Sequence, residues 1–464
     1  MKPVKAGGGK GLWFEALLKK GRIRRLGNLE TPDTIRSLQR KLYLKAKSEP
    51  EYRFYLLYDK LYRGDILLHA YRLARANGGA SGVDGVTFDQ IDEQGAGPFL
   101  AKLQEELKKQ EYRPMPVRRV YIPKPNGSGQ RPLGIPCLRD RVAQTAANLV
   151  LQPIFEADLT DNAYAYRPRR SAQDAVRRVH ALLRQGHTDV VDADLSKYFD
   201  EIPHAELMRS VARRISDAKV LRLIKLWLKA PVEECDEKGN RRLTGGKGQQ
   251  KGTPQGGVAS PLLANIYMRR FLLAWQQHFA TKLKAHVVNY ADDMVILCRG
   301  TAEKAKEAAE KIIMGMKLRM NQEKTRVVNA WRQPFDFLGY TFGPCYAVRS
   351  PDVYLGAKPS KTRIKRLYGK VREHLSRSNT DPYEEVIATL NWMLAGWAQY
   401  FSYGTLTRAY RAVDWLVERR LRGWLCRRHK DQGRGTRHFP TNKLYREYGL
   451  VCLANRLAVQ RSNA

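Results

Sequence analysis

Two adjacent carboxylates, Asp292 and Asp293, lie between two short apolar segments, residues 285–289 and 294–298. Short segments rich in Val and Ile are typical of strands, so the sequence predicts a tight hairpin that carries both acids at its tip. A buried pair of carboxylates is costly unless it is hydrogen-bonded or holds a metal ion. An isolated Asp-Asp pair is most often a polar turn. A functional site is favoured here because the sequence also holds a third carboxylate and a Lys/Arg pair at positions that suit metal and phosphate binding.

The third carboxylate is Asp194, near the end of a predicted strand over residues 188–195. Nucleotidyl transfer needs two divalent cations about 3.5–4 Å apart, which hold the attacking oxygen and the triphosphate. Mg²⁺ prefers oxygen ligands and keeps several waters, so Asp194 and the two hairpin acids suffice, with the backbone carbonyl of Leu195 as a further ligand. Asp192 competes with Asp194, because residues two apart in a strand point to the same side.

Four further features suit a nucleoside triphosphate. Lys124 and Arg131 flank a Gly-rich loop and are able to straddle a triphosphate. Gln255 lies in a Gly-rich turn, residues 252–257, where the backbone can approach a ligand. Phe199 follows Asp194 by five residues and would close on the sugar 2′ position, and Lys324 would protonate departing pyrophosphate. The ordinary alternatives are a basic loop, a helix-entry turn, a core phenylalanine and a surface lysine.

The elements that must position these residues follow one another in a set order. The pattern predicts a strand at 188–195, a helix at 205–228, the paired strands around 290, a helix at 302–316 and a strand at 325–330. This order is the ferredoxin-like split β-α-β arrangement, here with an insertion that holds a helix at 260–279. The first strand of such a sheet lies beside the hairpin, so acids distant in the sequence converge.

Helical spacing dominates both ends of the chain, over residues 33–78 and again after about residue 350. In the helix predicted at 406–426, one face is apolar and is expected to be core: Leu406, Tyr410, Val413, Val417, Leu421 and Trp424. The opposite face is cationic, with one aromatic residue: Arg408, Arg411, Trp415, Arg419 and Arg422. A solvated surface explains such a face equally well. The lack of balancing acids favours contact with nucleic acid.

Composition narrows the class of partner. The 464 residues carry a net charge of +37, which favours a polyanion, usually nucleic acid, without separating an enzyme from a chromatin or ribosomal protein. The six cysteines are scattered without a C-x-x-C pair, which argues against structural zinc and for reduced thiols in the cytoplasm. No apolar run is long enough for a membrane span or a signal segment, so no membrane partner is expected.

The segments in this order resemble a bacterial group II intron-encoded reverse transcriptase/maturase. The matching segments cover about residues 80–342: residues 82–85, 131–136, 164–168, 194–199, 252–257, 290–293, 321–325 and 337–340. Residues 390–392 and 396–401 are similar to the maturase domain of the family, which separates it from retroviral and retron enzymes.

The resemblance implies an α+β right-hand polymerase, with ferredoxin-like palm and fingers followed by an α-helical thumb (maturase) domain. It divides the chain into a basic N-terminal extension (1–80), fingers and palm (81–345), a thumb (346–430) and a short basic DNA-binding-like tail (431–464). It also selects Asp194 over Asp192, and it makes Phe199 a steric gate and Lys124 and Arg131 fingertip contacts. No zinc-type endonuclease is expected after the tail, so insertion would start from an existing DNA 3′ end.

The implied function is an RNA-directed DNA polymerase, with two Mg²⁺ or Mn²⁺ ions, that also binds its own intron RNA to promote splicing and mobility. The partners are group II intron RNA, an RNA template with a DNA primer, dNTPs and a DNA target. The alternatives are a domesticated relative in DNA repair or phage defence, a non-catalytic RNA-binding splicing factor, and an RNA-dependent RNA polymerase, which Phe199 opposes. The intron, the DNA target and the oligomeric state stay open.

Overall fold

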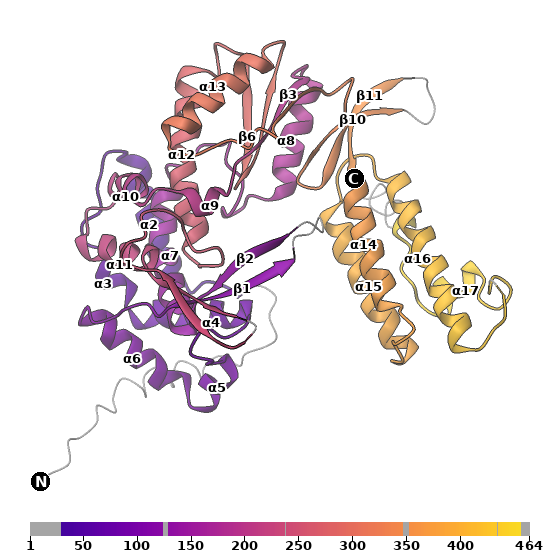
Figure 1. Ribbon diagram of the computed structural model, residues 1–464, viewed down its shortest axis with the longest axis horizontal. Coiled ribbons are helices and arrows are strands. Elements are labelled where there is room, and N and C mark those ends of the chain that lie inside the picture. Colours follow the sequence, from indigo (N-terminus) through magenta and orange to yellow (C-terminus); the bar gives the residue numbers. More distant parts are fainter. Residues whose placement is uncertain (1–28, 124–128, 237, 347–351, 434, 456–464) are drawn as a thin grey trace, which may run out of the picture. The chain divides into compact units, whose positions relative to one another are not determined.

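The computed structural model describes residues 29–123, 129–236, 238–346, 352–433 and 435–455 (Figure 1). The chain packs into two compact units and crosses between them repeatedly. Unit 1 holds the chain up to Arg169, Leu195–His278 and Ala309–Asn321, and unit 2 holds Arg170–Asp194, Phe279–Ala308 and the chain from Gln322. These units of packing cut across the segment boundaries expected from the sequence, which stay predictions.

Unit 1 consists of helices and one mixed sheet. Its helices are α2 (Asp33–Ser48), α3 (Tyr58–Leu61), α4 (Gly64–Asn77), α5 (Phe88–Glu93), α6 (Ala96–Lys108), α7 (Leu138–Glu156), α9 (Tyr198–Glu201), α10 (His204–Ala212), α11 (Ala218–Leu228) and α12 (Ser260–His278). The helical segment predicted over 33–78 is thus three helices. All three pack against α7, α2 and α4 most extensively.

The sheet of unit 1 has the order β2-β1-β4-β5, built from β1 (Val117–Pro123), β2 (Gln130–Ile135), β4 (Pro231–Cys235) and β5 (Arg241–Gly245). The β1–β2 hairpin agrees with the loop predicted between Lys124 and Arg131. The β4–β5 hairpin was not predicted, because its strands are short and polar and lack an apolar alternation. It joins the sheet through parallel pairing of β1 with β4.

Unit 2 holds two further sheets and the C-terminal helices. Its elements are α8 (Ala172–Arg184), β3 (Asp189–Asp194), β6 (His286–Tyr290), β7 (Asp293–Cys298), β8 (Arg326–Asn329), β9 (Phe335–Phe337), β10 (Tyr340–Tyr346), β11 (Val353–Pro359), α14 (Lys361–His374), α15 (Tyr383–Tyr400), α16 (Thr407–Arg428) and α17 (Thr441–Arg446). Helix α13 (Ala302–Gly315) spans the boundary of the two units.

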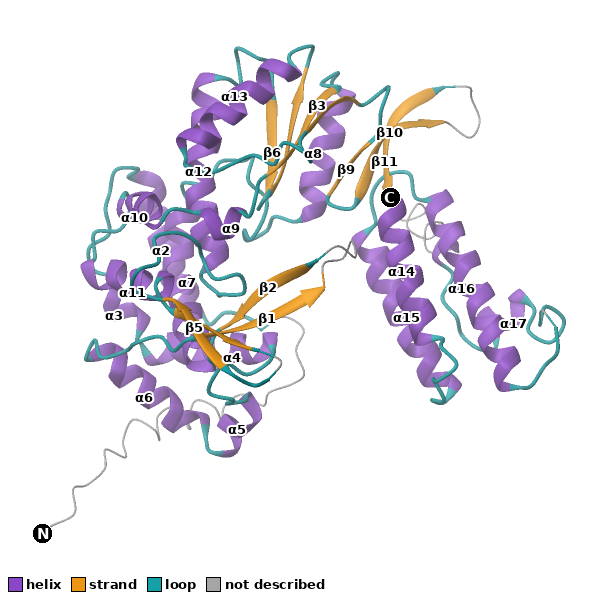
Figure 2. Cartoon of the chain, in the orientation of Figure 1, coloured by secondary structure: helices purple, strands orange, loops and turns teal. Residues whose placement is uncertain are grey.

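The four-stranded sheet of unit 2, here called the palm sheet, has the order β6-β7-β3-β8. Figure 2 labels its strands β3 and β6. All three pairings are antiparallel, as in a ferredoxin-like sheet. Its strands are short, and most of their buried residues are apolar, with Val the commonest. Helix α8 packs against this sheet through its apolar face, and a capping box between Ser171 and Asp174 sets where it begins.

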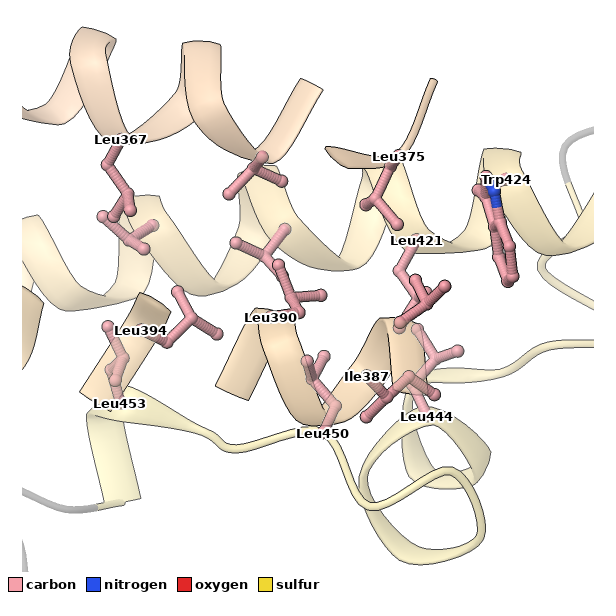
Figure 3. Packing of buried hydrophobic residues seen from close by; sticks show 14 of the residues in the cluster. Leu367, Leu375, Ile387, Leu390, Leu394, Leu421, Trp424, Leu444, Leu450 and Leu453 are labelled. Carbon is pink, nitrogen blue, oxygen red and sulfur yellow. The ribbon is translucent and has the colours of Figure 1, made fainter. Parts of the chain in front are cut away.

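The last four helices share one core, drawn close up in Figure 3. The apolar face predicted for α16 is buried in it, from Leu406 to Trp424, together with the stripe of α15 that runs through Leu390 and Leu394. Period-3.6 spacing of large aliphatic residues explains both helices. This confirms the helical C-terminal domain of the expected fold. Over the described residues, no helix combines the length and the apolar character needed to cross a bilayer.

The segment expected to be a separate basic tail is part of this core. Leu444, Leu450 and Leu453 are buried in it, and Figure 3 shows them beside α15. The side chain of Asn391 holds the segment from both sides, because its amide donates to the Gly449 carbonyl (2.8 Å) and its oxygen accepts from the Val451 N–H (2.8 Å). The described part of the tail is therefore a structural extension of the helical domain.

Truncation of Leu421 tests this core. Leu421 is fully buried between the helices, so Leu421→Ala should lower the free energy of unfolding by about 2–5 kcal/mol through lost burial and a residual cavity. The matched control is Leu44→Ala, since the Leu44 side chain is half-exposed on α2 and should cost no more than about 0.5 kcal/mol. Urea denaturation followed by tryptophan fluorescence measures both, and equal losses would contradict this packing.

Candidate active site

The hairpin that carries the acid pair turns in two residues. Tyr290 pairs with Asp293, which leaves Ala291 and Asp292 as the turn between β6 and β7. Ala291 has φ +58°, a left-handed conformation that tight hairpin turns require and that is unfavourable for a residue with a Cβ. The turn is braced from inside by the buried Asn289, whose amide donates to the Ala291 carbonyl at 2.9 Å. Backbone strain of this kind is often found at functional sites.

The third acid lies directly across the sheet from this hairpin. Asp194 is the last residue of β3 and is the register partner of Asp293 on β7. Directly opposite residues of antiparallel strands point to the same face, with Cβ atoms about 4.5–5.5 Å apart. The Thr325 hydroxyl accepts from the Asp194 N–H (3.4 Å) and extends the strand past its last pairing with β8. Carboxylates a hundred residues apart in the sequence are thus neighbours in the palm sheet.

These acids line an open pocket of about 470 Å³. Its charged lining is mixed: Asp192, Asp194, Asp293, Glu323, Lys324, Arg326 and Asp336. The rest of the lining includes Phe337 and Leu338, next to the β9–β10 turn. Asp292, in the hairpin turn, is half-buried and does not line the pocket. The structure therefore brings Asp194 and Asp293 into one cavity. Asp292 does not line this cavity, although it is the residue before Asp293.

The neighbouring acids raise the proton affinity of Asp293. Withdrawal from bulk water raises the pKa of Asp293 to about 6, and the negative charges of Asp292, Asp194 and Asp192 act in the same direction. Solvent still reaches the Asp293 side chain through the open pocket. A cation that binds at such a site stabilises the protein, because it removes the repulsion between the carboxylates.

Two cations offset part of this negative charge. Nζ of Lys324 lies 3.2 Å from an Asp194 carboxylate oxygen, and Arg326 donates to Asp192 at 3.0 Å. Arg326 is also the register partner of Asp192 in the sheet, so that pair is an ordinary cross-strand ion pair. Asp194, by contrast, lies past the last residue pair of β3 and β8. This difference favours Asp194 over Asp192 as the acid that is free to exchange partners.

The donor set fits a magnesium or manganese ion in chemistry. Carboxylate oxygens in an accessible pocket, with a backbone carbonyl next in the chain at Leu195, are the ligands that Mg²⁺ prefers. In the part of the chain that the structure describes, no three His, Cys, Asp or Glu side chains are already grouped to hold an ion. The Asp194 side chain pairs with Lys324 instead, so binding would require Asp194 to exchange that partner for the ion.

Of the remaining nucleotide residues that the structure describes, all lie in unit 1 except Lys324. Gln255 links Arg131 to an acid that was not predicted, since its oxygen accepts from Arg131 Nε (3.1 Å) and its amide donates to Asp200 (2.9 Å). The turn that carries Gln255 packs tightly on β2, because a Cβ on Gly256 would lie 2.3 Å from the Gly134 carbonyl oxygen. Glycine is therefore required at Gly256, which also has φ +106°.

Phe199 is buried on α9, and its carbonyl accepts from the Thr253 N–H (2.7 Å), which ties it to the same Gly-rich turn. A buried ring is compatible with a steric gate and with a core side chain. Leu195 is also buried and forms a bridge with Met320. Lys124 lies outside the described residues.

Most of the predicted cationic face of α16 is accessible: Arg408, Arg411, Trp415 and Arg419 are exposed. The guanidinium of Arg419 lies 5.5 Å from the centre of the Trp415 ring, a cation–π pair at the surface. Arg422 differs from the others, since it is half-buried and donates to the Phe439 carbonyl (2.9 Å) and the Thr441 hydroxyl (3.2 Å). Arg422 thus binds the C-terminal segment to α16.

Two residues of the site were not singled out from the sequence. Asn289 precedes Tyr290 and resembles any strand residue until its contact with the turn is known. Asp200 follows Phe199, and burial raises its pKa although the Gln255 amide opposes the shift. The adjacency of each to a predicted site residue was the only available signal.

The raised pKa of Asp293 predicts how stability depends on pH. Between about pH 4 and pH 6 the folded protein binds more protons at Asp293 than the unfolded chain, so its stability falls as pH rises. Asp293→Asn should therefore melt at a higher temperature than wild type at pH 8 in EDTA, with the gain lost below about pH 4. Millimolar Mg²⁺ should stabilise wild type more than the variant.

The control is Glu30→Gln, because the Glu30 side chain is 81% exposed and should give no gain. Thermal melts over this pH range measure all three proteins. An Asp293→Asn gain that persists unchanged at pH 4 would contradict the assigned repulsion between the acids.

Comparison with known proteins places these features in a family. Residues 122–342 match the sequence family described as reverse transcriptase (RNA-dependent DNA polymerase), and residues 364–440 match the maturase-specific domain of group II introns. The first match contains the palm sheet and the pocket acids, and the second contains α15 and α16.

Three individual proteins are similar to this chain. Protein YkfC of Escherichia coli is 35% identical over 66% of this chain and 87% of its own length. The group II intron-encoded protein LtrA of Lactococcus lactis is 30% identical over 62% of this chain, and the match spans 56% of LtrA. A telomerase structure from Candida albicans, with a fragment of telomeric RNA, has a TM-score of 0.40 at 14% identity, covering 75% of this chain and 66% of the telomerase.

The chain thus spans most of one bacterial relative and little more than half of the other. Its two matched segments follow each other in one polypeptide, polymerase domain first and maturase-specific domain second. The protein belongs to the family of group II intron-encoded reverse transcriptases that carry a maturase-specific domain.

Proposed function

We propose that this protein is an RNA-directed DNA polymerase that extends a DNA primer on an RNA template with dNTPs. The observation that carries the proposal is the register of the palm sheet, which sets Asp194 opposite Asp293 in a pocket open to solvent. Two Mg²⁺ or Mn²⁺ ions, held by Asp194, Asp292, Asp293 and the Leu195 carbonyl, would activate the primer 3′-oxygen and neutralise the triphosphate.

The chain's own side chains would orient the nucleotide. Arg131 is exposed and suited to pair with phosphate oxygens, and Lys124 is assigned the same role. Gln255 would hold Arg131 in place and contact the nucleotide or the template. Lys324, released from Asp194 when a cation binds there, would donate a proton or a positive charge to departing pyrophosphate.

The second proposed activity is binding of the protein's own group II intron RNA, which would stabilise the splicing-competent fold of that RNA. Splicing chemistry would belong to the RNA itself. The match to the maturase-specific domain and the exposed basic face of α16 support this role. Binding through many phosphates should weaken steeply with salt. A DNA target for intron insertion is the further partner that this role requires.

The free cysteines of the described chain favour a reducing compartment, so we place these activities in the cytoplasm. Primer extension on an RNA template is the test of the polymerase proposal. Loss of the reaction in an acid variant, with splicing assistance kept, would separate the two activities.

Two acids two residues apart give the sharpest version of this test. Asp194→Asn should lower the rate of primer extension by about a thousandfold or more, because it removes a metal ligand. Asp192→Asn removes a cross-strand ion pair with Arg326 and should cost less than about tenfold. Single-turnover extension with saturating dNTP measures both. An equal loss of extension rate in both variants would mean that the two acids affect the rate through the stability of the protein and that Asp194 is not a specific metal ligand.

Phe199 tests the choice of sugar. If its ring excludes the 2′-hydroxyl, Phe199→Val should raise incorporation of NTP relative to dNTP by about tenfold or more. A merely structural role would slow both substrates alike, since Phe199 is buried and its truncation leaves a cavity. Competition between dNTP and NTP on one RNA template gives the ratio directly. An unchanged ratio would remove the steric gate from the proposal.

A further inference from the structure

A second pocket, of about 340 Å³, lies among helices of unit 1 and has no role in the chemistry described above. It is lined by side chains from α10 and α12, from the end of α7 and from the residues that follow α7 and α10: Phe155, Leu159, Glu206, Arg209, Ser210, Arg213, Ile266, Arg269 and Arg270. None of these residues lines the pocket of the aspartates or contacts Gln255. We call it the arginine pocket.

One carboxylate of the arginine pocket is shared among three cations. Glu206 accepts from Arg209 (3.1 Å), Arg270 (3.2 Å) and Lys317 (3.1 Å). The bonds from Lys317 and Arg270 lower the pKa of Glu206 to about 2, so this acid stays ionised and cannot titrate away near neutral pH. Three positive charges therefore face a single negative one.

A second carboxylate, Asp158, lies next to the pocket and is shared by two more arginines. Arg213 donates to it, and Nε of Arg214 lies 3.3 Å from the same oxygen. Arg269 reaches only the backbone carbonyl of Asp158, at 2.8 Å. Over the described residues, Arg269 forms no ion pair with a carboxylate. Five cationic side chains thus share two carboxylates, Arg269 adds a sixth positive charge beside them, and the pocket keeps a positive excess.

This excess is costly in an isolated protein. Burial and the nearby charges of Arg213 and Arg214 lower the pKa of Arg269, while Asp158 raises it. Like charges held this close destabilise the fold unless an anion offsets them. The arginine fork suits the paired oxygens of a phosphate, and the apolar wall of Phe155, Leu159 and Ile266 suits the face of a sugar or base.

We propose that the arginine pocket binds a backbone phosphate of the intron RNA, as a contact separate from the template–primer site. The proposal rests on the proposed function, because it assigns part of the RNA contact to unit 1. Arg209 and Lys317 are 75% and 65% exposed, so a polyanion can reach them from solvent. A net charge of +37 over the chain favours such a partner over a small anion.

The test compares two double variants that remove equal charge. Arg209→Gln/Arg269→Gln removes two positive charges from the pocket. It keeps the ion pairs of Asp158 with Arg213 and Arg214 and of Lys317 with Glu206. Lys102→Gln/Lys108→Gln is the control, since both lysines are exposed on α6 of the same unit. The probe is a transcript of the group II intron that surrounds the gene. Its binding is followed by fluorescence anisotropy over a KCl series, with thermal melts to check folding.

The pocket variant should bind the transcript about tenfold more weakly, and the slope of log affinity against log salt should fall by about one per lost contact. The control should stay near wild type. Primer extension on poly(A) with oligo(dT) should be unchanged in both. The exposed single variant Arg209→Gln should show part of the loss and keeps the test valid if the double variant unfolds.

Equal affinity and equal salt slope for wild type and pocket variant would overturn the proposal. A second result would also overturn it: millimolar inorganic phosphate stabilises wild type but not the variant, while RNA binding is the same, which would make a free anion the occupant. Wild-type protein that extends no primer would instead refute the polymerase proposal, and the RNA-binding comparison would still decide the pocket.

Discussion

The candidate active site depends on one constraint, the antiparallel register of β3 against β7. Because Asp194 is paired with Asp293, both side chains leave the sheet on the same face at the same height. A slip of one residue in this register would send Asp194 to the opposite face. Apolar residues on both faces of the strands oppose such a slip, since it would move Val190 and Val191 out of their present packing. The core of the palm sheet thus fixes the geometry of its polar end.

The acids and the hairpin turn at this end of the palm sheet destabilise the fold. The acids repel one another, Ala291 has an unfavourable left-handed conformation, and buried Asn289 donates a hydrogen bond to the Ala291 carbonyl. Lys324 and Arg326 offset part of the charge without cancelling it. Sites that are unfavourable alone and favourable with a ligand are typical of function. The arginine pocket repeats the same arrangement with the opposite sign, as an excess of cations around too few acids.

Much of this was predictable from local patterns. Strands β3, β6 and β7, helix α13 and the two faces of α16 followed from hydrophobic periodicity, and their order predicted the palm sheet. The β4–β5 hairpin and β9 were not predicted, because their strands are short or polar. Strands β10 and β11 were not predicted because Gly and Pro interrupt their apolar pattern. The candidate acids were identified by their place at strand ends. Their distances and shared charges were not, because these depend on register and on neighbours such as Arg326.

The arginine pocket could not be predicted from the sequence either. Its polar residues come from α10, the residue after it and α12, and in the sequence they look like the ordinary polar side of amphipathic segments. Only the fold brings them together, so no motif in the chain marks them. A site assembled in this way is invisible to pattern reading, whereas a site carried by one turn, such as residues 290–293, is not.

The clamp of Asn391 on the C-terminal segment has an evolutionary consequence. Because Gly449 and Val451 are bonded to α15 and Leu450 and Leu453 fill its core, the end of the described chain cannot drift independently of the helix it covers. Exchange of C-terminal segments between homologues should succeed only when the matching helix travels with them. In this protein the helical domain and its C-terminal extension are therefore expected to evolve as one unit.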